Sequence, residues 1–269
     1  LILLIALVLI IGDRSKQNRL AHLKMSEQKE EIEAQRDQLE EMNRTKDRFF
    51  GIISHDMRGP VNAFQGLSAL TRMYLEKGDQ RRIPELIDKM DASSNRLSRL
   101  LDNLLNWALT QEGSFPYSPE RFTLKDRLYE VLDIFPLSAK AKSITIEDLT
   151  DHSLAIYADP NGFKTIVRNL INNAIKYSQK GDAIKIKSFK EDELVSVQVC
   201  DTGAGMSPEQ IERLFNLETN TSTPGTSGEK GSGLGLVLCQ ELIDLNKGKI
   251  GVKSELHKGA TFTVSFPKG

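Results

Sequence analysis

Apolar and polar positions alternate with a seven-residue period over the first part of the chain. From Ser15 to about Glu76, only three glycines and Pro60 interrupt a helical pattern. The early heptad rows contain Met25, Ile32, Leu39 and Lys46 on one seam and Met42 and Phe49 on the other, with Gln28 and Gln35 interrupting the second. This pattern predicts a coiled-coil helix over residues 12–46, and the alternating charges outside the seam indicate a solvated face.

The heptad register changes between Lys46 and Phe50. The later rows contain Phe50, Met57 and Phe64 on one seam and Ile53, Pro60, Leu67 and Tyr74 on the other. A four-residue step of this kind is a stutter that locally unwinds a coiled coil, and we expect a signal to shift helix register there. Pro60 removes a backbone donor inside the helix and predicts a kink.

A second helix is expected after a turn at residues 77–79, with Pro84 in its first turn. Its heptad rows contain Ile83, Met90, Leu97 and Leu104 on one seam and Leu86, Leu100 and Trp107 on the other, which Ser93 interrupts. Two antiparallel amphipathic helices cannot bury both seams alone. Residues 47–112 are therefore predicted to form a helical hairpin that dimerises into a four-helix bundle.

Turn residues separate this hairpin from a region of mixed pattern. The stretch 113–119 (GSFPYSP) predicts a linker. Beyond it, helices are expected at 124–142, 161–178 and 234–246, strands at 143–148, 154–158, 183–190, 194–200, 249–255 and 261–266, and a mobile loop at 219–233. Residues 120–269 are therefore predicted to form an α+β two-layer sandwich, with helices on one face of a largely antiparallel sheet.

The chain starts with an apolar run from Leu1 to Ile11, which is too short to span a bilayer because spanning needs about 20 residues. A signal-peptide core and a buried helix are alternatives. Basic residues follow the run instead of preceding it, as on the cytoplasmic side of a membrane helix. They are Arg14, Lys16, Arg19 and Lys24. We expect residues 1–11 to be the end of a truncated transmembrane helix, with a sensor region upstream.

Composition sets only broad limits on function. The 269 residues are 39% hydrophobic and 27% charged, which suits about two small globular domains. A net charge of −1 gives no general attraction to nucleic acid. Cys200 and Cys239 fit no metal or redox spacing, so they are expected to be free thiols in a reducing compartment.

One of the four histidines is placed for chemistry. His22, His152 and His257 lie in charged or turn-like segments and are expected at the surface. His55 falls at the outermost heptad position of a rigid helix. A neutral imidazole is a good nucleophile, and an ordinary pKa of about 6.5 keeps it mostly neutral at pH 7. Asp56 could hold one ring N–H, although adjacent helical residues do not face each other. These two residues alone leave an ordinary surface histidine as the alternative.

The sequence around His55 resembles a known motif. The run FFGIISHDMRGP is similar to the H box of the dimerisation and phosphoacceptor domain of sensor histidine kinases, with matches at Phe50, Ser54, His55, Asp56, Arg58 and Pro60. The resemblance implies that His55 accepts a phosphoryl group, that Asp56 assists as a base, and that Arg58 belongs to the same catalytic group. Gly59 departs from the family's usual Thr or Asn, which positions water for dephosphorylating the partner, so phosphatase activity is left open.

Three later segments carry nucleotide chemistry, and the first is NLINNAIKY. Asn169 and Asn173 are four residues apart, so they share a helical face and could offer amide oxygens to Mg²⁺. Lys176 lies on that face and could meet a phosphate, and Tyr177 could stack on a base. The alternative is that these are ordinary residues of a helix surface.

The second segment is DTGAGMS. Asp201 ends an expected strand and could accept the amino group of adenine, which would select adenine over guanine. Gly203 and Gly205 would let the backbone approach a ligand closely. The alternative is a plain turn.

The third segment is KGSGLGLVL. Gly231, Gly233 and Gly235 lead into a helix expected to start near Leu234, where backbone N–H groups bind phosphate well. Lys230 could add positive charge. The segment is neither the dinucleotide fingerprint that follows a strand nor a P-loop.

The order of the three segments resembles the ATP-binding (Bergerat) fold shared by histidine kinases, gyrase, the ninety-kilodalton chaperone and mismatch-repair ATPases. LFNLET resembles a degenerate F box with Phe215 as the match, and the ending GKIGVKSELHKGATFTVSFP resembles the family's last hairpin. The resemblance implies a phosphotransfer domain at 47–112 and a catalytic, ATP-binding domain at 120–269. Asn169 stands where the ATPases carry a water-activating Glu, and an amide cannot act as a base, so transfer to a supplied nucleophile is favoured.

The resemblance implies a sensor histidine kinase that uses ATP and Mg²⁺ to phosphorylate its own His55 and then passes the phosphoryl group to an aspartate of a response regulator. It also implies a homodimer, anchored in the inner membrane of a bacterium with this region facing the cytoplasm, and no direct binding of nucleic acid. One rival is an inactive dimer that binds ATP as a scaffold. A chaperone-type ATPase is another, disfavoured by Asn169 and the H box.

Overall fold

The computed structural model describes residues 2–111, 113–151, 153–215, 223–229 and 233–269. Within the helices it leaves out the side chains of residues 2–11, 13, 15, 18, 20, 21, 41, 45, 48, 49, 52, 55 and 99. The chain divides into two units, Leu1–Phe50 and Gly51–Gly269. The long helix α1 (Ile2–Glu76) belongs to both of them.

The first unit is a single helical segment whose predicted seam is open to solvent. Met25, Ile32, Leu39 and Met42 are each more than half exposed. Pairs such as Lys29 with Glu33 and Arg44 with Glu40 lie four residues apart on the polar surface, where ion pairs contribute little stability. The helix predicted for residues 12–46 is confirmed, whereas its association into a coiled coil stays a prediction. In the part of the chain that the structure describes, no helix has an apolar stretch long enough to cross a membrane.

The second unit begins with the predicted hairpin. The end of α1 turns at Gly78, passes a short 3₁₀ helix η1 (Gln80–Arg82) and continues into α2 (Ile83–Gln111). The buried seam positions are Ile53, Pro60, Leu86, Leu100 and Trp107. The helix is unbroken at Pro60, so the kink expected there stays a prediction.

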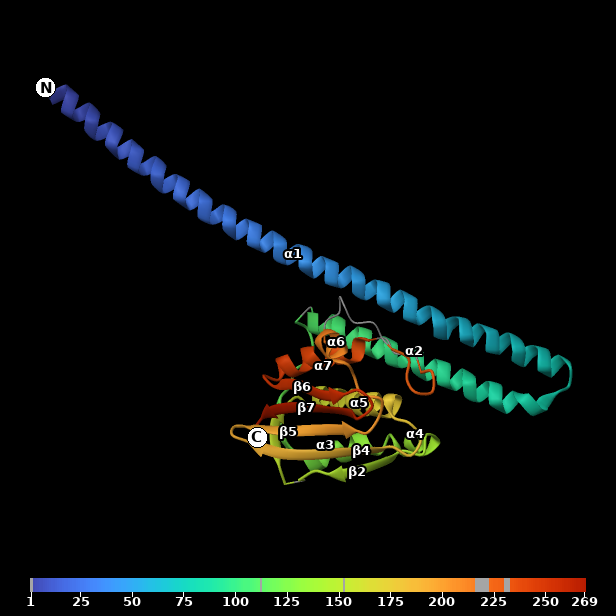
Figure 1. Cartoon of the computed structure of the whole chain (residues 1–269). Coiled ribbons are helices and arrows are strands. Elements are labelled where there is room, and N and C mark those ends of the chain that lie inside the picture. The colour runs from blue at the N-terminus through green and yellow to red at the C-terminus, as the bar shows by residue number, and fades with distance from the viewer. Residues whose placement is uncertain (1, 112, 152, 216–222, 230–232) are drawn as a thin grey trace. The chain divides into compact units, whose positions relative to one another are not determined.

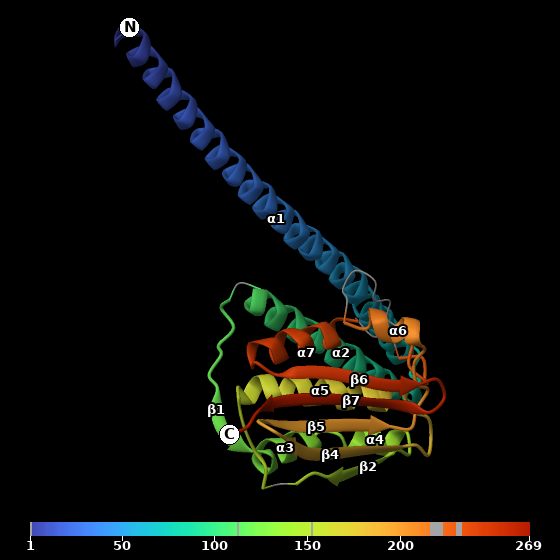
Figure 2. The ribbon, with the colours of Figure 1, turned by 60° about the vertical axis from the view of Figure 1, so that its left-hand side comes forward.

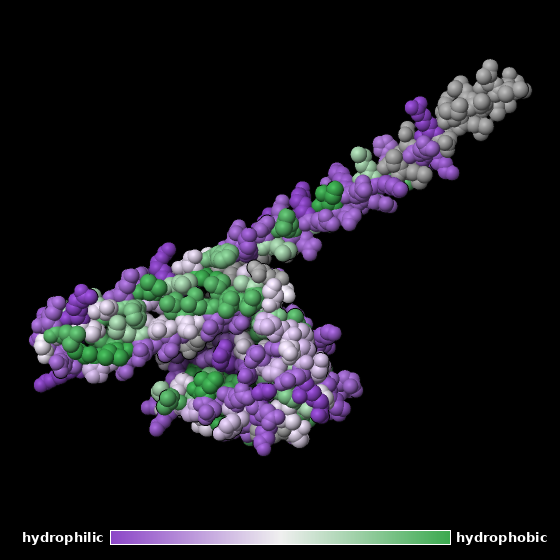
Figure 3. All heavy atoms as spheres, turned by 180° about the vertical axis from the view of Figure 1, so that it is seen from behind, coloured by the Kyte–Doolittle hydropathy of each residue, from purple (hydrophilic) through white to green (hydrophobic). Residues whose placement is uncertain are grey.

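Much apolar surface of the hairpin is exposed among the residues that the structure describes. Val61, Phe64, Leu70, Leu75, Ile87, Leu101 and Leu105 are between 38% and 59% exposed. Figure 3 shows apolar side chains gathered along the hairpin. Of these exposed residues, only Phe64 lies on a predicted heptad row, so the exposed apolar surface lies mostly beside the two seams, and dimerisation into a four-helix bundle stays a prediction.

Residues 120–269 fold into the predicted α+β sandwich after an irregular linker. Its main sheet has the strand order β2-β4-β5-β7-β6. The strands are β2 (Thr145–Leu149), β4 (Ala183–Glu191), β5 (Leu194–Asp201), β6 (Lys249–Glu255) and β7 (Gly259–Pro267). Only β2 and β4 run parallel among these neighbours, so the sheet is largely antiparallel. A small second sheet pairs β1 (Glu120–Thr123) with β3 (Ala155–Ala158).

The helices of the sandwich cover one face of the main sheet (Figures 1 and 2). They are α3 (Leu124–Leu132), α4 (Pro136–Ala141), α5 (Pro160–Tyr177) and α7 (Leu234–Leu245), with the short α6 (Pro208–Arg213) before α7. The core between helices and sheet includes Phe163, Leu170, Ile184, Leu238 and Phe266, all below 2% exposure. The opposite face carries exposed Lys185 and Lys187 in alternation with buried Ile184 and Ile186, which is the pattern of a half-buried strand.

The structure corrects three expectations. The single helix predicted at 124–142 is two helices, because Pro136 cannot donate to the preceding turn and instead starts α4 at its first position. The strand predicted at 143–148 begins at Thr145, since Ser143 has a positive φ of 55° and turns the chain. Helix α6 and strand β1 were not predicted. Residues 223–229 of the loop expected at 219–233 form an irregular turn, whereas 219–222 and 230–232 lie outside the described ranges, so the mobility of the loop is not tested.

Phe163→Ala is expected to lower the free energy of unfolding of the sandwich by about 3–5 kcal/mol. The Phe163 ring is fully buried and lies edge-on to Phe122 and Phe266, each with ring centroids 5.5 Å apart. Urea unfolding followed by far-UV circular dichroism measures the change. The control is Tyr129→Ala on α3, where the side chain is 73% exposed and the expected change is within about 0.5 kcal/mol. Equal losses for the two variants would contradict this assignment of the core.

Candidate functional site

Helix α5 carries the first predicted nucleotide segment, and its N-terminus is fixed by a buried polar network. The Asp159 side chain caps the helix by accepting from Gly162 N–H at 2.6 Å. Asn246, at the end of α7, accepts from Asp159 N–H at 2.7 Å through Oδ1 and donates to Leu242 O at 2.7 Å. Asp159 and Asn246 are only 1% and 2% exposed, so the start of α5 is tied to the end of α7 in the interior.

A hollow of about 1250 Å³ collects most of the predicted site residues. Those on its lining are Asp56, Arg58, Asn169, Asn173, Lys176, Tyr177, Asp201, Gly205, Gly233 and Gly235. They come from α1, α5, the end of β5 with the turn after it, and the start of α7, all within residues 51–269. The hollow is large enough for a nucleotide and combines apolar walls with a few polar groups, as ligand sites do.

Asn169 and Asn173 project from the same side of α5, as the four-residue spacing predicts. Nδ2 of Asn169 is buried and makes no conventional hydrogen bond among the described residues. The Cys239 thiol on α7 is fully buried and lies 3.9 Å from Ile166 O. Burial raises the pKa of Cys239 to about 12, and an interaction with the Asn169 amide partly opposes the rise. Nδ2 of Asn169 is therefore a buried donor that lacks a conventional acceptor among the described residues.

Asp201 ends β5 at the wall of the hollow and is 9% exposed. Its Oδ1 accepts from Gly203 N–H at 2.9 Å and from Ala260 N–H at 3.2 Å. Burial raises the pKa of Asp201, and the two backbone donors oppose that rise. Both bonds go to one carboxylate oxygen, which fixes the orientation of the other.

The two glycines after Asp201 are required by close backbone contacts. Gly205 has a φ of +65°, and a Cβ there would lie 1.9 Å from Glu255 O. A Cβ on Gly203 would lie 2.4 Å from Tyr177 O, to which the next residue, Ala204, donates its N–H at 3.0 Å. The segment after β5 is therefore clamped between the end of α5 and the β6–β7 turn, so it is more than a plain surface turn.

The third segment meets the first at the start of α7. Gly233 caps α7 with a φ of 71°, and Leu234, its first residue, is buried at 2% exposure. A Cβ on Gly235 would lie 3.4 Å from Asn169 Oδ1. The N-terminus of α7 therefore lies against the Asn169 amide of α5. Lys230 and Gly231 lie outside the described residues.

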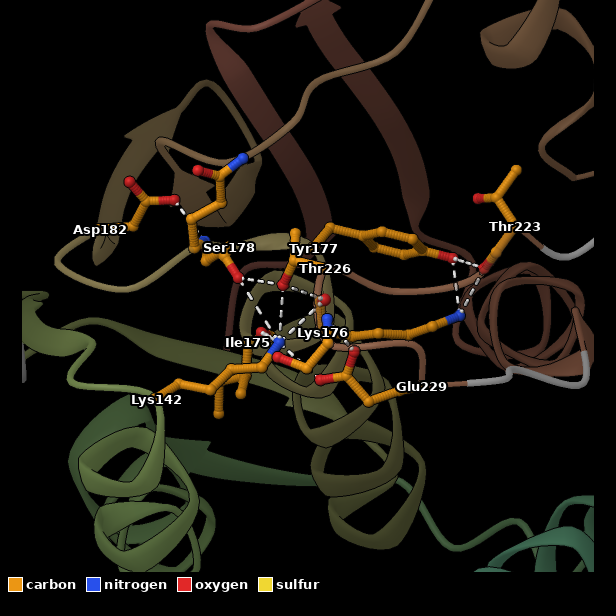
Figure 4. A network of polar contacts seen from close by, with 11 residues as sticks. Lys142, Ile175, Lys176, Tyr177, Ser178, Asp182, Thr223, Thr226 and Glu229 are labelled. Carbon is orange, nitrogen blue, oxygen red and sulfur yellow. Dashed lines mark hydrogen bonds and ion pairs between the residues drawn. The ribbon is translucent and has the colours of Figure 1, made fainter.

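Lys176 and Tyr177 end α5 at the hollow. Lys176 Nζ donates to Tyr177 Oη at 2.8 Å and to Thr223 O at 3.0 Å, and Tyr177 Oη donates to the same carbonyl at 3.2 Å (Figure 4). Phe215 is half-buried just after α6 and is not on the lining, whereas its neighbour Leu214 is. Phe215 stays a prediction from the resemblance alone.

The predicted phosphoacceptor lies in α1, but the structure does not describe its side chain. His55 is helical and directly precedes Asp56, which is half-buried and lies on the hollow with Arg58 and Gly59. Its expected outward position is therefore not tested. The hairpin nevertheless brings two of its H-box neighbours, Asp56 and Arg58, to the same hollow as the nucleotide segments.

Sequence reasoning missed the apolar wall of the hollow. Met206, Leu236 and Phe262 all line it. Phe262 belongs to a strand whose alternation predicts an inward side chain, but alternation does not say that the side chain meets a ligand. Leu236 similarly looks like an ordinary core residue of α7.

Two family models match successive parts of the chain. Residues 45–113 match the His Kinase A (phospho-acceptor) domain, and residues 158–269 match the histidine kinase-, DNA gyrase B- and HSP90-like ATPase. The chain belongs to the sensor histidine kinases. A sensor histidine kinase pairs one domain that carries the acceptor histidine with one that binds ATP.

Curated sensor kinases are similar over most of this chain. The autoinducer 2 sensor kinase/phosphatase LuxQ of Vibrio vulnificus is 28% identical over 239 residues, which are 86% of this chain and 28% of LuxQ. The sensor histidine kinase GacS of Pseudomonas protegens is 29% identical over 243 residues, or 88% of this chain and 26% of GacS. The chain thus spans little more than a quarter of the length of these relatives.

Solved histidine kinases share the fold. Acinetobacter baumannii AdeS superimposes with a TM-score of 0.62 over 79% of this chain and 97% of its own, at 22% identity. ThkA, in a complex with the response regulator protein TrrA, superimposes with a TM-score of 0.58 over 81% of this chain and 60% of its own, at 23% identity. The predicted fold class, a helical hairpin followed by an α/β sandwich of the histidine kinase type, is confirmed.

Asp201→Asn is expected to stabilise the kinase at pH 7 more than at pH 4. Because burial raises the pKa of Asp201, the folded chain keeps a proton that the unfolded chain loses above about pH 3.9. The free energy of unfolding of the wild type therefore falls as pH rises from that value through the raised pKa, whereas an asparagine side chain does not ionise.

Urea unfolding of both proteins at the two pH values measures this difference, and all other titrating groups cancel in the comparison. If the free energy of unfolding of Asp201→Asn relative to the wild type does not rise between pH 4 and pH 7, Asp201 carries no desolvation cost.

Proposed function

We propose that this chain catalyses transfer of the γ-phosphoryl group of ATP to His55 and then presents phospho-His55 to an aspartate of a response regulator. The observation that supports this most strongly is the meeting of three sequence segments and two H-box residues at one hollow. Asn169 and Asn173, Asp201, and the glycines at the start of α7 are separated in sequence but share its lining. The matched phosphoacceptor and ATPase domains supply the two halves of the same reaction.

The site suits ATP in three respects. Asp201 is buried and oriented by two backbone donors, so it could accept the amino group of adenine, with Tyr177 and the apolar wall against the ring. The glycine-flanked N-terminus of α7 offers backbone N–H groups to phosphate. Lys176, and Lys230 with Gly231 from the undescribed stretch, would add positive charge and backbone donors.

The donor set also fits Mg²⁺. This ion prefers a few protein oxygens and keeps phosphate and water as its other ligands. Asn173, helped by Asn169, would supply amide oxygens at the hollow, because both side chains lie on its lining. When bound with ATP, Mg²⁺ would neutralise phosphate charge.

The transfer is an in-line displacement at phosphorus. A ring nitrogen of neutral His55 gives its lone pair to the γ-phosphorus, and the bond to the bridging oxygen breaks with its electrons going to ADP. The proton of the other ring nitrogen passes to a carboxylate, a role that we give to Asp56. Arg58 offsets the negative charge that gathers on the transferred group. Because Asn169 replaces a general base, water is not activated in competition.

A homodimer follows from the exposed apolar side chains of the hairpin. Phe64, Leu101 and Leu105 are 44–59% exposed on helices that already share a buried seam. A second hairpin would cover them in a four-helix bundle. This inference agrees with the His Kinase A domain match.

A response regulator and a membrane complete the proposal. The ThkA structure contains the response regulator protein TrrA, and a receiver aspartate is the chemical partner that a phosphohistidine requires. Membrane attachment is supported by the apolar run at residues 1–11 and the basic residues after it. On this proposal the described kinase region faces the cytoplasm of a bacterium.

His55→Gln is expected to abolish incorporation of label from γ-labelled ATP with Mg²⁺, because the amide provides no nucleophilic ring nitrogen. The wild-type label should be lost in acid and kept in base, as expected of a phosphoramidate. His22→Gln in the exposed first unit is the matched control and should label like the wild type. Intact ATP binding with no label on the wild type would favour the inactive scaffold, and label that persists in His55→Gln would move the acceptor elsewhere.

Asn173→Ala is expected to lower the rate of labelling by about 100-fold, because it removes a preorganised group at the phosphates. The control is Asn161→Ala, at the exposed start of the same helix and away from the hollow. The measurement is the initial rate of phosphohistidine formation at saturating ATP. A rate close to that of the wild type would remove Asn173 from the proposed site.

A further inference from the structure

Lys142 lies at the C-terminal end of α5, although it belongs to a different part of the fold. It caps α4 directly after that helix ends at Ala141, and its side chain is only 15% exposed. Its Nζ donates to Ile175 O at 2.9 Å, to Lys176 O at 3.1 Å and to Ser178 O at 3.5 Å. The last carbonyls of a helix have no partners within the helix, and a cation there is favoured by the helix dipole. Lys142 therefore caps α5 from outside.

The same ammonium holds a second segment, the turn at residues 223–229. Nζ also donates to Thr226 Oγ1 at 2.9 Å and forms an ion pair with Glu229 (Figure 4). Thr226 in turn donates its N–H to Lys176 O at 3.0 Å and its hydroxyl to Ser178 O. One half-buried cation thus joins the end of α5 to this turn through both a carboxylate and a hydroxyl.

Glu229 has two roles in this arrangement. Its backbone carbonyl accepts from Gly225 N–H at 2.7 Å, and its carboxylate accepts from Ser227 N–H at 2.8 Å, so it closes the turn on itself. Burial alone would raise the pKa of Glu229, but hydrogen bonds from Lys142 and from the backbone of Glu229 and Ser227 hold the pKa below its ordinary value. The carboxylate is therefore charged at neutral pH and available to the ammonium.

The turn forms part of the wall of the nucleotide hollow. Thr223, Pro224, Gly228 and Glu229 all lie on its lining. Thr223 also offers its carbonyl to Lys176 Nζ and Tyr177 Oη, the two groups that end α5 at the hollow. Whatever fixes the turn against α5 consequently fixes the position of Lys176 and Tyr177 as well.

We propose that Lys142 is a positioning residue for the nucleotide: paired with Glu229, it fixes the 223–229 turn to the end of α5 and sets the wall against which ATP binds. This rests on the proposed function in one respect, namely that the hollow takes ATP. Lys142 does not touch the nucleotide. It acts through Lys176, Tyr177 and the turn, so its removal should weaken nucleotide binding while leaving the transfer step itself unchanged.

The test is a double-mutant cycle on the full 269-residue chain, read by calorimetric binding of a non-hydrolysable ATP analogue with Mg²⁺. We expect Lys142→Met to raise the Kd about tenfold and Glu229→Gln about fivefold, as for partners in one network. The double variant should bind no more weakly than Lys142→Met, because each change removes the same contact. Lys140→Met, an exposed lysine two residues earlier on α4, is the control and should bind like the wild type.

Kinetics provide a second readout that a general loss of structure would not reproduce. For Lys142→Met, the KM for ATP should rise about tenfold while the kcat of His55 labelling stays within about twofold. Lys142→Arg, which keeps the charge, should recover most of the affinity. If Lys142→Met fails to fold, Glu229→Gln and Lys142→Arg still decide the matter, since Glu229→Gln keeps the cation at the cap and Lys142→Arg replaces it with another.

The outcomes separate the two proposals. Failure of the wild type to bind the analogue would overturn the nucleotide site itself. Wild-type binding that neither single variant weakens would overturn only the positioning role of Lys142. Losses of nucleotide affinity that multiply in the double variant would also overturn the positioning role of Lys142, because the two residues would then act independently.

Discussion

The site depends on helix α5 being held at both ends by buried polar contacts. At its start, Asp159 caps the helix and is bound in turn by Asn246 of α7. At its end, the Lys142 ammonium occupies the free carbonyls. Between them the apolar face of α5 packs on the sheet, with Phe163 and Leu170 fully buried. These contacts fix the position of α5 in the fold and, with it, the place of its two asparagines at the hollow.

Periodicity predicted the fold where one pattern runs without interruption. The heptads of the hairpin, the alternation of β4 and β5, and the helix carrying Asn169 and Asn173 were all correct to within a few residues. The predictions were wrong where a short local signal sets the boundary of a helix. Pro136 separates α3 from α4, and Ser207 with Gln210 forms a capping box at the start of α6. Strand β1 (ERFT) buries only Phe122, so its sequence shows no alternation of apolar and polar residues.

The site was predictable in its motifs but not in its supports. Asn169, Asp201 and Gly235 stand in short recognisable segments, and the structure brings them to one hollow. Lys142 and Glu229 are far apart in the sequence and belong to no motif, so only the folded chain shows that they meet. The same holds for Phe262. The alternation of β7 predicts that its side chain points inward, but it does not predict that the side chain lines the hollow. Polar support and apolar lining depend on tertiary contacts that no sequence window contains.

The burial of Cys239 has a consequence for the chemical durability of this site. Oxidants and electrophiles attack cysteine as the thiolate, and a thiol with a pKa of about 12 is almost wholly protonated at neutral pH. The sulfur lies behind Asn169, without exposure to solvent. Oxidation or alkylation of this sulfur would enlarge a buried side chain that interacts with the Asn169 amide. Because the sulfur is buried and the thiol stays protonated, Cys239 is itself protected from such agents.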